Sequence, residues 1–130
     1  MLITIDTSAL IAVIGNEAAK PDIVRLTEGS SLCAPVSVHW EIGNAFSAMF
    51  KRRQSTLDLA RKALAVYQAI PVKYFDYPLE QALELSARLG IYAYDAYLVQ
   101  CAMQTSSPLL TLDRGLRAAA EKMSVQTLEA

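Results

Sequence analysis

The sequence predicts an α/β fold in which helices cover both faces of a mostly parallel central sheet. Short apolar runs recur along the chain, and most are followed by one or two segments with the periodicity of an amphipathic helix. Strands that alternate with helices in this way pair in parallel. The chain has 130 residues and contains no internal repeat, low-complexity tract or linker. We therefore expect one domain over residues 1–130, long enough to bury a core.

The N-terminal quarter begins with a short apolar, β-branched run at residues 2–5, which stops at Asp6 and predicts a buried parallel strand. A helical pattern follows over residues 8–14 and is broken by Gly15. The next helix is expected to start near Pro21, a favoured first helical residue, and to end near residue 28, before Gly29. Residues 31–35 predict a second strand, which Pro35 ends.

The middle of the chain predicts two helices, a strand and a third helix. Ser37 is expected to cap a helix that ends near Arg53, and Ser55 or Thr56 to cap the next one. Residues 71–75 predict the third strand, Asp76 is expected to cap the helix after it, and residues 79–89 form that helix. The inward-facing residues expected in the first two helices are Val38, Ile42, Ala45, Phe46 and Met49, and then Leu59, Ala63, Val66 and Tyr67.

Asp95 lies where a carboxylate is unexpected, at the head of a helix with an apolar stripe. Leu98, Val99 and Ala102 follow it at the spacing that brings them onto the same helix face. A lone buried carboxylate is costly unless it is paired, hydrogen-bonded or bound to a metal. Asp95 is therefore either the N-cap of its helix or part of a site. A strand at residues 108–112, a helix at 114–122 and a weak strand at 125–127 complete the chain.

Three further carboxylates occupy comparable places. Asp6 ends the first strand, Asp113 ends the fourth, and Glu41 lies in the first turns of the helix after the second strand. In open α/β sheets the carboxyl ends of the strands share one edge with the N-termini of the following helices, and ligands bind there. Taken singly, Asp6 and Asp113 are also good helix caps, and Glu41 suits a helix dipole. Together with Asp95, however, they would concentrate negative charge on one rim.

A hard divalent cation would neutralise such a cluster, because Mg²⁺ and Mn²⁺ prefer carboxylate oxygens and water. Polar side chains flank the four carboxylates and could hold metal-bound water; they are Thr7, Ser8, Asn44 and Thr111. No other catalytic group is apparent. His39 is the only histidine, and Cys33 and Cys101 lack metal-ligand spacing and are expected to be buried thiols in a reducing cytoplasm.

These motifs, taken in order, resemble the PIN domain, and most closely the VapC-type toxins of toxin–antitoxin pairs. The resemblance covers the whole chain and rests on Asp6-Thr7-Ser8-Ala9-Leu10, on Glu41 with Asn44, on Asp95-Ala96-Tyr97-Leu98, and on the segment from Leu110 to Leu116. It implies that Asp6, Glu41, Asp95 and Asp113 bind Mg²⁺ or Mn²⁺ and cut RNA, in a cytoplasmic protein that pairs with a small antitoxin. Activated water and bound metal suffice for phosphodiester hydrolysis.

The partners are predicted from local features, because a net charge of −1 gives no global attraction to nucleic acid. Arg114 and Arg117 adjoin Asp113 and are candidates for RNA phosphates. The apolar residues around Trp40 and Phe50 could form a groove for an antitoxin helix. Tyr92, Tyr94 and Tyr97 suit either a homodimer interface or stacking on bases. No signal peptide or membrane span is expected.

Three enzyme or cofactor classes fit poorly. A haloacid dehalogenase-type enzyme needs a second Asp where Ser8 stands, a response-regulator receiver needs an acidic pair near the first strand and a late Lys, and a dinucleotide-binding module needs a Gly-rich turn. The remaining alternative is a PIN-like module that binds RNA or protein without cutting.

Overall fold

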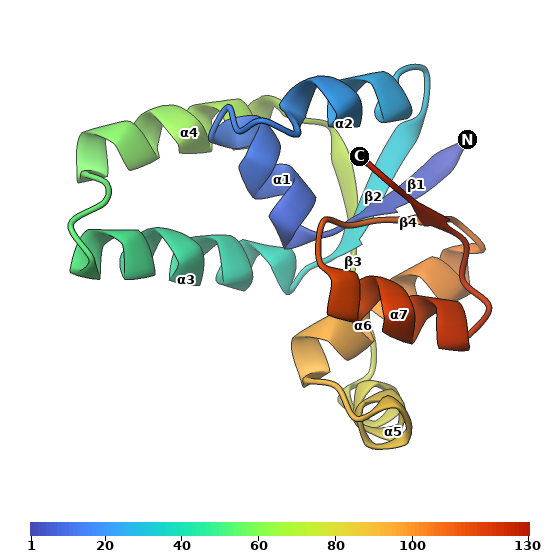
Figure 1. Ribbon diagram of the computed structural model, residues 1–130. Helices are drawn as coiled ribbons and strands as arrows, with labels where there is room; N and C mark the ends of the chain where they lie inside the picture. Colours follow the sequence, from blue (N-terminus) through green and yellow to red (C-terminus); the bar gives the residue numbers. More distant parts are fainter.

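The computed structural model describes residues 1–130 and contains seven helices and a five-stranded sheet. Strands and helices alternate as the sequence predicts (Figure 1). The elements are β1 (Leu2–Ile5), α1 (Thr7–Ile14), α2 (Lys20–Thr27), β2 (Ser31–Pro35), α3 (Val38–Lys51), α4 (Leu57–Ala69), β3 (Val72–Phe75), α5 (Leu79–Leu89), α6 (Ala93–Thr105), β4 (Leu109–Leu110), α7 (Arg114–Lys122) and β5 (Thr127–Leu128). None of the helices is both long and apolar enough to cross a lipid bilayer.

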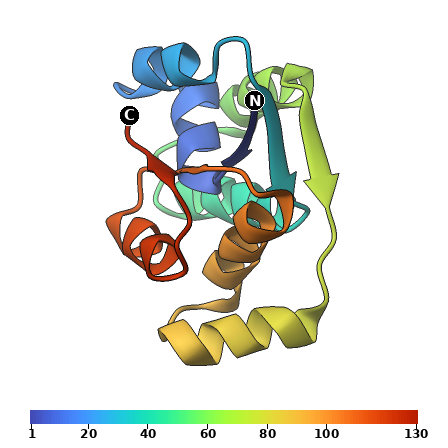
Figure 2. The same ribbon diagram turned by 90° about the vertical axis from the view of Figure 1, so that its right-hand side faces the viewer.

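The sheet is parallel throughout and has the order β3-β2-β1-β4-β5. The chain moves outward from β1 through β2 to β3, then returns to the other side of β1 to form β4 and β5. Figure 2 shows β3 at one edge of the molecule and the C-terminal segment at the other. The strand order therefore reverses between β1 and β4, and such a reversal opens a crevice at the carboxyl ends of the two strands.

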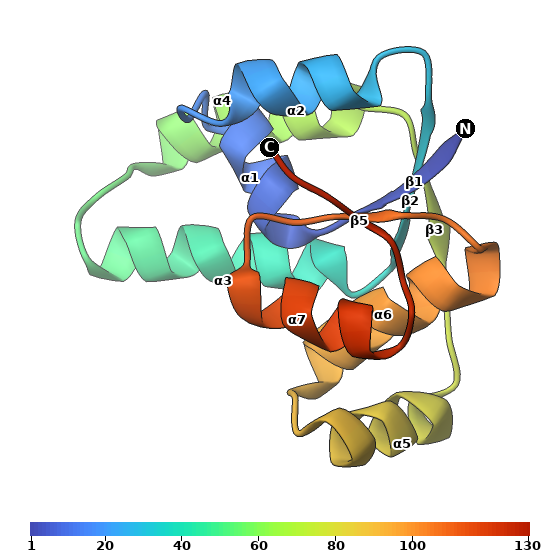
Figure 3. The ribbon, with the colours of Figure 1, turned by 45° about the vertical axis from the view of Figure 1, so that its right-hand side comes forward.

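The helices form two groups on opposite faces of the sheet. The helices α1 to α4 lie on one face, and α5 to α7 lie on the other (Figures 1 and 3). On the first face α1 packs against α2, α3 and α4. On the second face α6 packs against β1, β2 and β4 and also contacts α5 and α7, and α7 contacts β5. The predicted α/β class with helices on both faces is thus confirmed.

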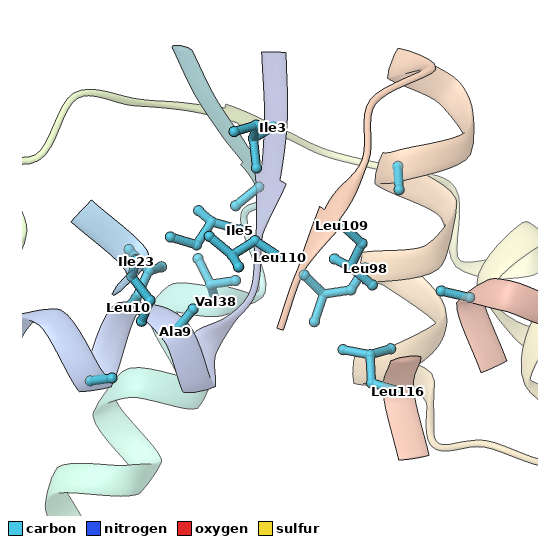
Figure 4. Packing of buried hydrophobic residues seen from close by; sticks show 14 of the residues in the cluster. Ile3, Ile5, Ala9, Leu10, Ile23, Val38, Leu98, Leu109, Leu110 and Leu116 are labelled. Atoms are coloured by element: carbon cyan, nitrogen blue, oxygen red, sulfur yellow. The ribbon is translucent and has the colours of Figure 1, made fainter. Parts of the chain in front are cut away.

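The hydrophobic core follows from the alternation of side chains along the central strands. Ile5 and its register partner Leu110 face α1, where they meet Leu10, whereas Leu109 faces α6 and meets Leu98 (Figure 4). All five side chains are at most 1% exposed. Full burial of such a side chain stabilises the fold by about 1.5–3 kcal/mol. The stripe predicted for α6 is confirmed, since Leu98, Val99 and Ala102 are all buried.

The interior of α4 differs from the expected stripe. Tyr67 is buried as predicted, and Thr56 caps the helix by accepting from the Leu59 backbone N–H at 3.3 Å. Leu59 and Val66, however, are 56% and 44% exposed, and the prediction that they face inward is wrong. The buried contact runs instead through Ala60 and Tyr67, whose hydroxyl meets His39 Nδ1 at 2.5 Å and accepts from the Tyr74 hydroxyl at 2.7 Å.

Two predicted caps do not form. Ser37 does precede α3, but its backbone is helical and its side chain makes no capping hydrogen bond. Asp76 is not the cap of α5, because that helix begins after Pro78. In both cases the polar side chain lies at the carboxyl edge of the sheet without its expected backbone partner.

The two cysteines are buried, as expected, but their surroundings are more polar than the sequence suggests. Cys33 on β2 and Cys101 on α6 lie with their Sγ atoms 4.0 Å apart. The Thr4 hydroxyl lies 3.4 Å from Cys33 Sγ and 2.7 Å from the Ser107 hydroxyl. A small network of hydroxyl and thiol groups therefore joins β1, β2 and α6 behind the carboxyl edge.

Candidate functional site

Asp6 is the most constrained carboxylate of the site. It directly follows β1, is only 4% exposed, and caps α1 by accepting from the Ala9 backbone N–H at 3.0 Å. The hydroxyls of Thr111 and Ser8 also reach its oxygens, at 2.6 Å and 2.8 Å. Burial raises the pKa of Asp6, the hydrogen bonds partly offset this rise, and repulsion from Asp113 adds to it.

Asp113 follows β4 and lies at the more open side of the site. Its Oδ1 accepts from the backbone N–H groups of Gly115 and Leu116, at 2.8 Å and 3.1 Å, and so caps α7. Its own backbone N–H donates to the Thr111 hydroxyl at 3.0 Å. Because that hydroxyl also bonds Asp6, the chain ends of β1 and β4 are fixed relative to each other. The predicted caps at Asp6 and Asp113 are therefore confirmed, and their part in a metal site stays a prediction.

Glu41 lies in the first turn of α3, as predicted. Its Oε1 atom is buried and has no hydrogen-bond partner, and the buried hydroxyl of Thr7 also lacks one. Burial raises the pKa of Glu41 to about 7; proximity to Thr7 partly offsets this, while Asp95 and Asp6 add repulsion. An unsatisfied buried oxygen beside other carboxylates is costly, and Glu41 Oε1 is therefore available as an acceptor in this site.

Asp95 is not the N-cap of α6. The helix begins at Ala93 after Tyr92, and Asp95 occupies its first turn with no side-chain hydrogen bond. The cap interpretation of this residue is therefore wrong. Burial raises the pKa of Asp95 first of all, and repulsion from Asp113 and Asp6 adds to it.

All four carboxylates line one cleft of about 680 Å³ at the reversal between β1 and β4. We call it the acidic cleft. Of the predicted supporting residues, Thr7, Ser8 and Asn44 also line it, whereas Thr111 lies behind Asp6 and holds it. Residues from four segments of the chain thus meet at this cleft. The lining residues that were not predicted are Ile11, Trp40, Ala45, Tyr94 and Leu98.

The two predicted arginines do not line the cleft. Arg114 is exposed at the start of α7 and forms no salt bridge within the chain. Arg117 is engaged, because it donates to the Thr111 carbonyl oxygen at 2.9 Å and lies 3.4 Å from Glu129. A direct phosphate contact stays a prediction for both, and the geometry favours Arg114.

Among the lining residues that were not predicted from the sequence, Trp40 and Tyr94 are the two aromatic ones. They are 62% and 49% exposed, so each presents an aromatic surface next to the acidic cleft. A signal was available: each directly precedes a helical carboxylate, in Trp40-Glu41 and Tyr94-Asp95.

The donor set fits a hard divalent cation in its chemistry. No three of the acidic, histidine and cysteine side chains are grouped closely enough to hold one ion as they lie. Mg²⁺ does not require such a group, because proteins usually bind it through one or two carboxylates and leave several waters in place. The free Oε1 of Glu41 and the Thr7 and Ser8 hydroxyls are suitable partners for a metal ion or its waters.

Comparison with solved structures gives the same fold. PAE2754 from Pyrobaculum aerophilum matches with a TM-score of 0.73 and 23% identity over 99% of this chain and 89% of that one. VapBC2 from Rickettsia felis, bound to a promoter DNA fragment, matches with a TM-score of 0.70 and 11% identity, over 99% of this chain and 98% of that one. VapC20 from Mycobacterium tuberculosis, described as a sarcin–ricin loop cleaving toxin, matches with a TM-score of 0.63 and 15% identity, over 90% of this chain and 94% of that one.

No curated protein matches the sequence significantly. The sequence model of the PIN domain, in contrast, matches residues 3–122, which span β1 to the end of α7 and include all four carboxylates. Since that match covers most of the chain, and the fold agrees with it, this protein belongs to the PIN domain family.

Proposed function

We propose that the protein is a metal-dependent endoribonuclease and the toxin of a VapBC-like toxin–antitoxin pair. One observation carries the catalytic part: Asp6, Glu41, Asp95 and Asp113 line a single cleft, and burial and mutual repulsion raise the pKa of the first three. A fold keeps such repulsion when a cation or a catalytic task compensates for it. The cleft contains no Cys, His or Lys that could serve instead.

The residues of the cleft have different parts in the proposed reaction. A bound Mg²⁺ or Mn²⁺ supplies a Lewis acid and makes water a better nucleophile. Asp6 is held rigid by Ala9, Ser8 and Thr111, so it would fix the position of the ion. Glu41 Oε1 has no partner within the chain, so it is free to accept a hydrogen bond from water in the cleft.

RNA binding would rest on local contacts. Arg114 adjoins Asp113, is exposed and has no acidic partner, so it is available to a phosphate group. Trp40 and Tyr94 lie at the cleft and offer surfaces on which bases stack.

The toxin part of the proposal draws on the fold relatives. Solved structures with this fold include VapBC2 from Rickettsia felis and FitAcB from Neisseria gonorrhoeae, the latter with a TM-score of 0.56. Exposed apolar side chains on α3 and α4 offer a surface for an amphipathic antitoxin helix; they are Phe50, Leu57, Leu59 and Val66. A homodimer in the cytoplasm is part of the same proposal.

The nuclease proposal is tested with purified protein and single-stranded RNA. We expect cleavage in Mn²⁺ or Mg²⁺, none in EDTA, and a loss of at least about a hundredfold in Asp6→Asn. Cleavage that persists in chelator, with contaminating nucleases excluded, would contradict the metal mechanism. RNA binding without cleavage in any metal would support the alternative of a non-catalytic PIN-like module.

The toxin proposal is tested by expression. Expression of the chain alone should slow growth of the host, and both Asp6→Asn and co-expression of a small protein encoded next to the gene should relieve the effect. Toxicity that Asp6→Asn retains would point to a non-catalytic action. Copurification of the small protein with the chain would identify it as the antitoxin.

A further inference from the structure

A second, smaller pocket adjoins the acidic cleft and is not used by the proposed reaction. It has a volume of about 70 Å³ at the carboxyl ends of β2 and β3. We call it the aromatic pocket and define it by Ser37, Trp40, Phe75, Asp76, Tyr77 and Tyr97. Trp40 lines both this pocket and the acidic cleft, so one indole ring borders the two.

The pocket contains a polar group that lacks a partner. Ser37 is only 2% exposed, and its hydroxyl forms no hydrogen bond within the chain. A buried hydroxyl in this state lowers stability until something bonds to it. The Asp76 carboxylate at the same pocket also has neither an ion pair nor a side-chain hydrogen bond, although it is exposed to water. Both groups are therefore available to an occupant.

The chemistry of the walls selects the kind of occupant. Phe75 and Tyr77, with ring centroids 6.1 Å apart, and Tyr97 form apolar, aromatic sides, and the indole of Trp40 is 62% exposed beside them. Flat aromatic groups pack well against such surfaces. A phosphate is disfavoured by the carboxylate of Asp76, and an aliphatic group would leave Ser37 without a partner. A planar heterocycle with a donor on its edge satisfies the aromatic and the polar side chains.

Given the proposed nuclease function, on which this inference rests, we propose that the aromatic pocket is a base-recognition subsite. One base next to the cleaved phosphate stacks on Trp40 and turns its edge into the pocket. An exocyclic amino group of that base donates to the Asp76 carboxylate, and the Ser37 hydroxyl bonds a neighbouring ring atom. The small volume admits the edge of a base and leaves the rest on the indole. Adenine, cytosine and guanine carry such an amino group, whereas uracil does not.

Trp40 itself is the reporter for the test, because it is the only tryptophan of the chain. Its fluorescence is titrated with the ribohexamers A6, C6 and U6 in EDTA, where the proposed reaction is off. We expect A6 or C6 to change the fluorescence at concentrations at least about tenfold lower than U6. Ser37→Ala and Asp76→Asn should each reduce that preference by threefold or more. Both variants should fold normally, since neither loses a contact within the chain.

Competition against a fluorescein-labelled hexamer extends the test to variants of the tryptophan. Trp40→Ala should weaken binding roughly tenfold, and Trp40→Phe should recover most of the loss by keeping a stacking surface. Leu83→Ala is the control, because Leu83 is 52% exposed on α5 and lines neither the acidic cleft nor the aromatic pocket. Its affinity and base preference should equal those of the wild type.

Mapping of cut sites in a random RNA pool with Mn²⁺ separates this inference from the function it rests on. Cleavage whose base preference is unchanged in Ser37→Ala and Asp76→Asn would overturn the subsite and leave the nuclease intact. Selective binding at Trp40 without any cleavage would overturn the nuclease and retain the pocket as a base-binding site. Trp40 fluorescence that no oligonucleotide alters would overturn the subsite and leave this face to a protein partner.

Discussion

Replacement of Glu41 by Gln is expected to stabilise the metal-free protein at and above neutral pH. In the unfolded chain the carboxyl has its ordinary pKa of 4.5, and in the folded chain burial raises the pKa to about 7. Between these values the folded state holds the proton more tightly, so stability falls as the pH rises from about 4.5 to about 7 and stays lower above that. Gln carries no charge and removes this dependence.

The magnitude follows from the difference between the two pKa values. At about 1.4 kcal/mol per pKa unit, the difference between the folded and unfolded pKa of Glu41 corresponds to about 3 kcal/mol of unfolding free energy. Because the cleft is open to water, screening reduces the effect to about 1–2 kcal/mol. For a chain of 130 residues, this raises the melting temperature by roughly 4–7 °C.

Thermal unfolding in EDTA at pH 5 and pH 8, followed by circular dichroism, measures the effect. We expect Glu41→Gln to melt clearly above the wild type at pH 8 and close to it at pH 5. Glu84→Gln, on the exposed face of α5, is the control and should follow the wild type at both pH values. A Glu41→Gln protein that melts below the wild type at pH 8 would refute the reasoning, since the charge would then be stabilising.

Three further predictions concern other side chains. Asp95→Asn should melt at the same or a higher temperature than the wild type in EDTA but gain much less from millimolar Mn²⁺, since a bound ligand stabilises only the state that binds it; an equal gain would remove Asp95 from the metal site. Arg117→Ala should lose about 1–3 kcal/mol of stability in urea unfolding, because the hydrogen bond from Arg117 to the Thr111 carbonyl oxygen is partly buried. Arg114→Ala should keep its stability but bind RNA more weakly, and its RNA affinity should depend less on salt. The reverse pattern would contradict a structural role for Arg117 and a phosphate contact by Arg114. Leu10→Ala should cost about 2–5 kcal/mol in the same assay, because Leu10 is 0% exposed; a cost below about 1 kcal/mol would show that the core is loosely packed.

Much of the fold could be predicted because local signals agree with one another. The bounds of β2, α5 and α7 coincide with the expected ones, since Pro35, Gly90 and Asp113 mark their ends in sequence. In α4 the prediction that Leu59 and Val66 face inward failed, because the buried face of a helix depends on which neighbouring element packs against it. Small Ala60 and the hydrogen-bonded Tyr67 make that contact, and the hydrophobic residues beside them remain outside.

The four carboxylates could be predicted as a group because the topology of a parallel sheet brings strand ends to one edge. Their individual environments could not. The start of α6 at Ala93 removes Asp95 from the cap position, and only the fold places the Thr111 hydroxyl against Asp6. The proximity of Cys33 to Cys101 likewise depends on β2 and α6 lying side by side, and 68 residues separate the two thiols in sequence.

Direct measurement of Mn²⁺ binding tests the central claim, which is that four carboxylates from separate parts of the chain form one cation site. The electron paramagnetic resonance signal of free Mn²⁺ is followed as protein is added at pH 7.5. We predict that the wild type and Glu84→Gln bind Mn²⁺ equally, and that Asp6→Asn, Glu41→Gln, Asp95→Asn and Asp113→Asn each bind it at least about tenfold more weakly. A wild type that leaves the signal unchanged, or four variants that bind as the wild type does, would contradict the account.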